Sequence, residues 1–244
     1  MSLSKNQIKL INSLGQKKYR KTHQLFVAEG VKVVGELLSS SLQLHMLFTT
    51  EDFDVPSQYL EKTTQISEVE LKKISSLKTP NKVLGVFEIP VPEENEVKGL
   101  VVALDGINDP GNLGTIIRLC DWFGIEQLIC STDTVDCYNQ KVIQSTMGSI
   151  TRVSINYTNL SSFLEETKLP TYIADMEGTN VYKTVLPEKA ILIMGNEANG
   201  ISKEIRSVVS NKISIPRFGE TQETESLNVA TATAILLSEF KRNV

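Results

Sequence analysis

The chain has 244 residues, of which 41% are hydrophobic and 22% charged, and its formal net charge at pH 7 is −4. This length allows one large α/β domain or two smaller ones, and it excludes a small disulfide scaffold. The apolar stretches are far too short to span a bilayer, and no secretory signal is recognisable at the start, so we expect a cytoplasmic protein. Cys120, Cys130 and Cys137 lack Cys-x-x-Cys spacing, which predicts buried thiols and no bound metal.

Basic residues gather at the start of the chain. Residues 1–24 contain six lysines and arginines and no acidic residue, and Lys17, Lys18, Arg20 and Lys21 surround Tyr19. Such a run is typical either of a solvated face or of a surface that neutralises RNA phosphates. These four basic residues are therefore the candidate RNA contacts.

The first ninety residues alternate between short helical and extended patterns. Helices are predicted at residues 8–14, 31–38 and 67–74, and strands at 25–27, 45–48 and 83–87. Ser67 and Glu70 have the spacing of a capping box, which marks the start of the third helix. The pattern predicts a small α/β domain over residues 1–90.

A stretch rich in proline and acidic residues follows and disfavours regular structure. We therefore predict a linker at 91–99 and a second domain at 100–244. Apolar runs at 100–104, 127–130, 152–155, 171–174, 190–194 and 212–215 alternate with segments of helical spacing, and a last helix is predicted at about 227–240. This alternation is typical of a mostly parallel sheet with both faces covered.

Three polar, glycine-containing stretches come directly after predicted strands, at residues 105–114, 195–200 and 216–228. Loops that follow parallel strands meet at the carboxyl edge of the sheet, where such folds bind ligands. A P-loop and a dinucleotide fingerprint are both absent, and both histidines lie outside residues 101–244. These features favour a nucleoside ligand over a phosphate-rich one, and they disfavour Ser-His-Asp catalysis.

Arg118 lies in the helix predicted after the first of these stretches. Helical side chains point toward the helix N-terminus, so its guanidinium is expected near the helix mouth, where an anion would be favoured. The alternative is an ordinary surface ion pair with Asp121. Both interpretations are open at this point.

The three stretches together resemble the motifs of the SpoU (TrmH-type) branch of the SPOUT superfamily of RNA ribose 2′-O-methyltransferases. The similar segments are Asn108 to Arg118, Ile193 to Ser202, and Ile215 to Ala230, and the resemblance covers the chain from Lys98 to its end. The segments Lys17–Lys21 and Phe26–Gly30 are similar, less specifically, to the substrate-binding module found ahead of this catalytic domain in many members.

This resemblance implies a deep trefoil knot in the C-terminal domain, S-adenosylmethionine as cofactor, RNA as substrate and a homodimer. The catalytic residues it implies are Arg118, Asn112, Glu197, Ser226 and Asn228. The cofactor-binding residues it implies are Met194, Gly195, Asn196, Gly200, Ile215, Pro216, Ser226 and Leu227.

Two roles for Arg118 are open. It either accepts the proton of the ribose 2′-hydroxyl, or it stays cationic and stabilises the developing alkoxide. The second is favoured, because a guanidinium is a poor base.

Two other functions are weighed against methyl transfer. An RNA-binding or ribosome-associated protein could keep the fold without catalysis, although the complete set of motif residues disfavours it. A nicotinamide-dependent oxidoreductase is disfavoured by the missing fingerprint and the missing histidine acid. Within methyl transfer, both rRNA and tRNA are open as substrates, and the N-terminal module favours rRNA.

Overall fold

The computed structural model describes residues 3–51, 53–91, 97–221 and 226–242. Contacts divide the chain into two compact units, Met1–Val91 with Asp136–Thr151, and Pro92–Val135 with Arg152–Val244. We call them the N-terminal unit and the sheet unit. The sequence-based division had placed 136–151 in the C-terminal domain, whereas the structure groups this segment with the N-terminal unit. Of the predicted linker, residues 92–96 lie outside the described residues.

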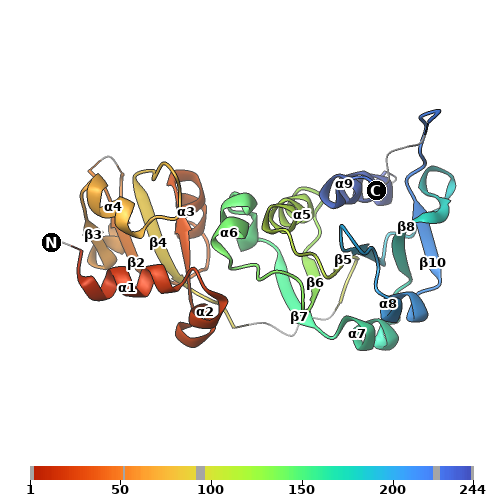
Figure 1. Ribbon diagram of the computed structural model, residues 1–244, viewed down its shortest axis with the longest axis horizontal. Coiled ribbons are helices and arrows are strands. Elements are labelled where there is room, and N and C mark those ends of the chain that lie inside the picture. Colours follow the sequence, from red (N-terminus) through yellow and green to blue (C-terminus); the bar gives the residue numbers. More distant parts are fainter. Residues whose placement is uncertain (1–2, 52, 92–96, 222–225, 243–244) are drawn as a thin grey trace. The chain divides into compact units, whose positions relative to one another are not determined.

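The N-terminal unit is built on a four-stranded sheet with the order β1-β4-β2-β3 (Figure 1). β1 (Leu25–Glu29) and β2 (Leu44–Thr49) run antiparallel to β4 (Val83–Glu88), and β3 (Thr63–Gln65) runs parallel to β2. The helices are α1 (Lys5–Ser13), α2 (Lys17–His23), α3 (Val31–Leu38), α4 (Glu68–Ile74) and α6 (Gln140–Thr146), with 3-10 turns η1 (Ser57–Lys62) and η2 (Ser149–Thr151). The structure confirms the elements predicted here, and it adds α2 and β3, which were not predicted.

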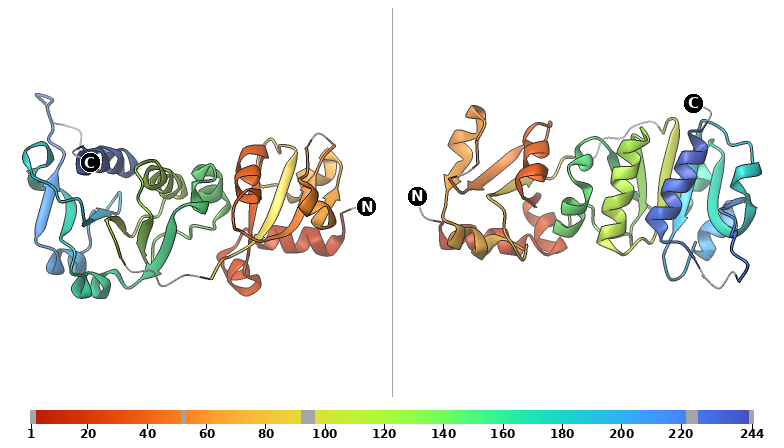
Figure 2. Two further views of the ribbon diagram at one scale, coloured as in Figure 1. Left: turned by 180° about the vertical axis from the view of Figure 1, so that it is seen from behind. Right: turned by 90° about the horizontal axis from the view of Figure 1, so that it is seen from above.

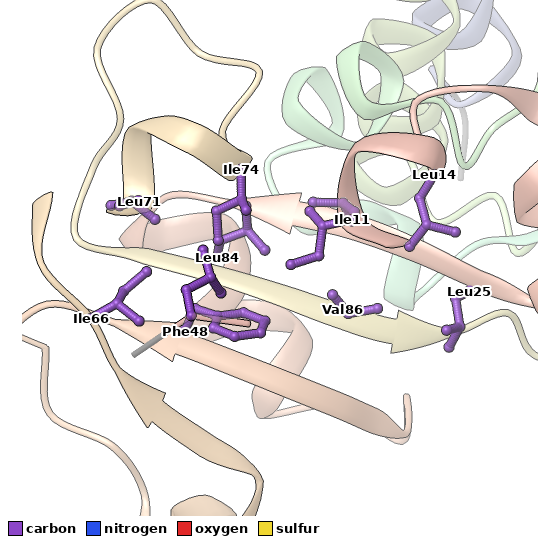
Figure 3. Close-up of a cluster of buried hydrophobic side chains, with 11 residues drawn as sticks. Ile11, Leu14, Leu25, Phe48, Ile66, Leu71, Ile74, Leu84 and Val86 are labelled. Atoms are coloured by element: carbon purple, nitrogen blue, oxygen red, sulfur yellow. The ribbon is translucent and has the colours of Figure 1, made fainter. Parts of the chain in front are cut away.

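A continuous apolar core joins α1 and α4 to one face of this sheet (Figure 3). Ile11 and Leu14 from the first helix meet Leu84 and Val86 of β4, and all four are fully buried. The predicted capping box is present, with the Ser67 hydroxyl accepting from the Glu70 backbone N–H and the Glu70 carboxylate accepting from the Ser67 backbone N–H. Helix α4 is therefore stabilised both by its local cap and by burial of one of its faces.

Arg20 is an interior residue, which corrects its assignment as an RNA contact. Its side chain is 2% exposed, and its Nε and Nη2 donate to Oδ2 of Asp136 at 2.9 and 2.6 Å. Nη1 donates to the carbonyls of Leu14 and Gly15, so the guanidinium also satisfies the end of α1. A buried charge needs such partners, and Asp136 comes from the segment 136–151.

The same segment brings aromatic packing to β1. The ring of Tyr138 lies 4.9 Å from that of Phe26, centroid to centroid, and burial raises the pKa of the Tyr138 hydroxyl above its usual range. Helix α6 follows directly and contacts β1. Residues 136–151 therefore complete the core of the N-terminal unit.

The sheet unit contains six parallel strands in the order β10-β8-β9-β5-β6-β7. The strands are β5 (Leu100–Asp105), β6 (Gln127–Ser131), β7 (Ser154–Thr158), β8 (Thr171–Asn180), β9 (Ala190–Gly195) and β10 (Asn211–Ser214). The helices are α5 (Pro110–Trp122), α7 (Leu160–Glu166), α8 (Lys203–Val208) and α9 (Val229–Phe240), and the 3-10 turn η3 (Val181–Lys183) follows β8. The parallel sheet and all six predicted strands are confirmed.

Helices cover both faces of this sheet, which explains why its central strands are continuous apolar runs. α5 and α9 lie side by side on one face, and α7 and α8 lie on the other (Figures 1 and 2). All three cysteines are buried thiols outside any disulfide, as expected, and burial with a contribution from Asp121 raises the pKa of the Cys120 thiol to about 12. Among the described residues, no helix is long and apolar enough to cross a membrane.

Strands β8 and β10 approach each other unusually closely at Gly178. The pairing register shifts between Lys212 and Ile213, and a Cβ on Gly178 would lie 2.6 Å from backbone atoms of Ile213. No L side chain fits this contact without moving a strand. The close approach therefore requires glycine at this position.

Replacing Gly178 by alanine is expected to lower the free energy of unfolding by about 1–3 kcal/mol, because one of the two backbones must shift. Gly219→Ala is the control, since no atom lies within 4 Å of the added methyl group. Urea unfolding followed by circular dichroism measures both variants. Equal stability of the two would contradict the contact.

Candidate functional site

The carboxyl ends of β5 and β9 form a topological switch point. From β5 the chain continues to β6 on one side, whereas β9, its other neighbour, is reached only later in the chain. Loops on either side of such a point diverge and leave a crevice in which α/β folds bind ligands. Residues 106–109 and 196–202 occupy this place.

The loop after β9 is closed tightly by backbone and side-chain hydrogen bonds. The backbones of Asn196 and Gly200 exchange two N–H···O bonds of 3.0 and 2.8 Å, and Gly200 has a positive φ of 66°. Nδ2 of Asn196 donates to the carbonyl of Gly106 at 2.6 Å, across the switch point. A Cβ on Gly195 would lie 2.5 Å from the Gly200 carbonyl carbon, so glycine is required at Gly195.

Asn112 joins the three predicted loops to one another. Its Nδ2 donates to Oε1 of Glu197 at 2.8 Å, and its Oδ1 accepts from Nδ2 of Asn228 at 2.9 Å. Asn112 lies in the first turn of α5, Glu197 in the loop after β9, and Asn228 at the start of α9. The predicted convergence of the three stretches is therefore present, and we call this chain of side chains the amide relay.

Helix caps hold both ends of the amide relay. The side chain of Asp109, the N-cap of α5, accepts from the backbone N–H of Asn112 at 2.8 Å, and Pro110 takes the first helical position. The side chain of Asn228, the N-cap of α9, accepts from the backbone N–H groups of Ala230 and Thr231. Asn228 therefore lies at the junction between the third loop and α9.

Arg118 is exposed on α5 and makes no side-chain hydrogen bond or ion pair with any residue that the structure describes. The alternative interpretation assigned it to Asp121. Instead, both carboxylate oxygens of Asp121 accept from Nε of Arg152 at 3.0 Å. The guanidinium of Arg118 is thus left available to an anionic ligand.

The other predicted site residues follow β9 and β10. Met194 is buried in β9, Ile215 and Pro216 are half-buried just after β10, and Ser226 and Leu227 are exposed immediately before α9. Residues 222–225, which belong to the third motif, lie outside the described residues. Lys17, Lys18 and Lys21 are exposed on α2 in the N-terminal unit.

Two aspartates at the same sheet edge were missed by the sequence analysis. Asp105, at the end of β5, is 8% exposed and accepts from the backbone N–H of Ser202 at 2.7 Å. Asp133 follows β6, and its carboxylate lies close to Gly106: a Cβ added to Gly106 would be 3.2 Å from Oδ2 of Asp133. Both come at or after the end of a strand, which is the signal that could have identified them. Within the described part of the chain, no three His, Cys, Asp or Glu side chains gather as a metal site.

Asn228→Ala removes both the cap of α9 and the link to Asn112, so we expect it to cost about 1 kcal/mol of stability. Asn228→Ser keeps a capping oxygen and loses only the link, and its cost is expected to be a few tenths of a kcal/mol. Hydrogen exchange at the Ala230 and Thr231 amides reports the cap directly. Equal exchange in the two variants would exclude the capping role.

Comparisons with known proteins agree with this geometry. Residues 99–238 match the SpoU rRNA Methylase family, and residues 5–85 match the MRM3-like substrate binding domain. The chain is 31% identical to the 23S rRNA (guanosine(2553)-2′-O)-methyltransferase RlmP of Bacillus subtilis, over 98% of this chain and 97% of that protein.

Two solved structures share the fold over nearly the whole chain. One is a protein of the TrmH family from Porphyromonas gingivalis, with a TM-score of 0.89, 38% identity and 99% of each chain covered. The other is an AdoMet-bound rRNA methyltransferase from Sinorhizobium meliloti, with a TM-score of 0.85, 27% identity, and 100% of this chain and 98% of that chain covered. The family match spans more than half of the chain and contains all three motifs, and so this chain belongs to the SpoU rRNA methylase family.

Proposed function

We propose that this protein transfers a methyl group from S-adenosylmethionine to a ribose 2′-hydroxyl of ribosomal RNA. The observation that carries this proposal is the amide relay, which gathers residues of all three family motifs at the switch point of the sheet. The relative from B. subtilis is by name a 23S rRNA 2′-O-methyltransferase, and the match covers 98% of this chain and 97% of that protein. 23S rRNA is therefore the first substrate to test.

The chemistry of the loops fits the cofactor. Half-buried Ile215 and Pro216, with Leu227 at 48% exposure, offer apolar surface for a purine ring, and the loop 195–200 offers backbone groups. The carboxylate of Glu197 suits a neighbouring positive charge. Residues Met194–Asn196, Gly200, Ile215–Pro216 and Ser226–Leu227 would hold S-adenosylmethionine, which when bound supplies an electrophilic methyl group.

Arg118 is the group we assign to the RNA. An exposed guanidinium that has no partner among the described residues can bind a phosphate through two parallel N–H donors and stabilise the negative charge that develops on the 2′-oxygen. Asn112, in the first turn of the same helix, and Glu197 connect the first two loops, and we assign Ser226 to orient the ribose. In this assignment Arg118 stays cationic throughout.

A second copy of the chain is expected to pack on the face formed by α5 and α9. Trp122, at the end of α5, is 84% exposed, and aromatic side chains are enriched at protein interfaces. We therefore propose a homodimer.

We also propose that the C-terminal segment is threaded as a deep trefoil knot. After the edge strand β10, α9 returns to pack on α5 and β9 in the middle of the sheet. This return supports a threaded path.

Arg118→Ala is expected to lower methyl incorporation into unmodified 23S rRNA by about 10²–10³-fold, with cofactor binding retained. Arg242→Ala is the control, because Arg242 is also an exposed arginine but pairs with Glu239. Labelled methyl transfer measures the rate, and alkaline hydrolysis locates the product as a resistant phosphodiester bond. Cofactor binding without any incorporation into rRNA or tRNA would favour the non-catalytic RNA-binding alternative.

Trp122→Glu is expected to shift the protein from dimer to monomer, since a buried unpaired carboxylate opposes association. Sedimentation equilibrium of the full chain measures the mass. A wild-type monomer at micromolar concentration would overturn the proposed dimer.

A further inference from the structure

A hollow lies at one end of the N-terminal sheet, outside the site already described. It is a shallow depression that is open to solvent, with a volume of about 380 Å³. The lining residues are His23, Gln24, Leu25, His45, Glu88, Ile89 and Val91. Both histidines of the chain therefore line this one hollow, and neither takes part in the proposed reaction.

Two irregular backbone positions shape this hollow. His45 is the extra residue of a β-bulge, because Leu44 pairs with Phe87 and Met46 with Val86. Gln24, which ends α2, has a positive φ of 54°, a conformation that is uncommon for a residue other than glycine. Bulges redirect side chains and are frequent beside functional sites.

The exposed face of α2 adds positive charge beside the hollow. Lys17, Lys18 and Lys21 are exposed on this helix, whereas Arg20 points into the core. The Tyr19 ring stacks on His23 with centroids 6.5 Å apart, and the Lys18 ammonium lies over the Tyr19 ring. Cationic and aromatic groups thus alternate along the surface next to the hollow.

The chemistry of the lining selects the ligand. Glu88 is an exposed carboxylate in the hollow and would repel a phosphate placed there. A nucleobase is neutral, stacks on imidazole rings, and can donate an amino hydrogen to a carboxylate. Single-stranded RNA can present such a base while its phosphates lie outside, on the lysines.

We propose that this hollow binds one unpaired, amino-bearing base of the RNA substrate, held between His23 and His45 and read by Glu88. Lys17, Lys18 and Lys21 hold the flanking phosphates. This inference rests on RNA being the substrate, as proposed above, but it concerns binding and is independent of methyl transfer.

The test is binding of the full chain to fluorescent oligocytidine and oligouridine, without cofactor, over a series of salt concentrations. His23→Ala and His45→Ala are each expected to raise the Kd for oligocytidine about tenfold, with the salt dependence unchanged. The triple lysine-to-alanine variant at 17, 18 and 21 is expected to flatten the salt dependence. Gln43→Ala is the control, since Gln43 is exposed next to β2 and does not line the hollow.

Base selectivity tests the role of Glu88. The wild-type chain is expected to prefer oligocytidine over oligouridine, because cytosine carries an amino donor where uracil carries an acceptor. Glu88→Gln is expected to remove this preference, since an amide both donates and accepts. All these side chains are exposed, so thermal unfolding of the variants is expected to match the wild type.

The outcomes separate this inference from the proposed function. Wild-type affinity in the histidine variants, a reduced salt slope in them, or no base preference in the wild type would overturn the hollow as a base site even if methyl transfer occurs. Conversely, base-selective binding without methyl transfer would support the hollow and count against the proposed reaction.

Discussion

The geometry of the site depends on one side-chain amide, that of Asn112. Its nitrogen donates to Glu197 and its oxygen accepts from Asn228, so donor and acceptor are both used, in opposite directions. A carboxylate in its place would repel Glu197, and an apolar side chain would leave both partners without this contact. Individually such hydrogen bonds contribute only about 1 kcal/mol, and their importance here is that they fix three loops relative to one another.

The parallel sheet makes this arrangement available. Strand order reverses between β5 and β9, which opens space at the carboxyl edge, and the Asn196 side chain spans that space to the carbonyl of Gly106. Helix α5 begins on one side of the opening, and α9 returns to lie against it. The first turns of two helices therefore meet beside the loop after β9. Asn228, which caps α9, is itself a candidate site residue, and Asp109, which caps α5, accepts from the backbone N–H of Asn112.

Local patterns were sufficient for most of the fold. Apolar runs located all six strands of the sheet unit, and polar stretches after strands located Asn112, Glu197 and Asn228. Long-range partners left no such signal. Arg20 lies in a basic run, and its partner Asp136 is 116 positions away in the sequence. The residues next to Arg20 in the sequence therefore do not indicate that its side chain is buried. For the same reason helix α2, which has no apolar face, was missed.

The segment 136–151 has a consequence for how the protein is made. Its residues close the core of the N-terminal unit through Asp136, Tyr138 and α6, although they are synthesised after β5, α5 and β6. During translation, the first 91 residues therefore emerge before Asp136, the carboxylate that pairs with Arg20, and before Tyr138, whose ring packs on Phe26. Domains usually fold in the order in which they are made, but here completion of the first unit must wait for the middle of the second. Folding of the N-terminal unit is in this sense coupled to synthesis of the sheet unit.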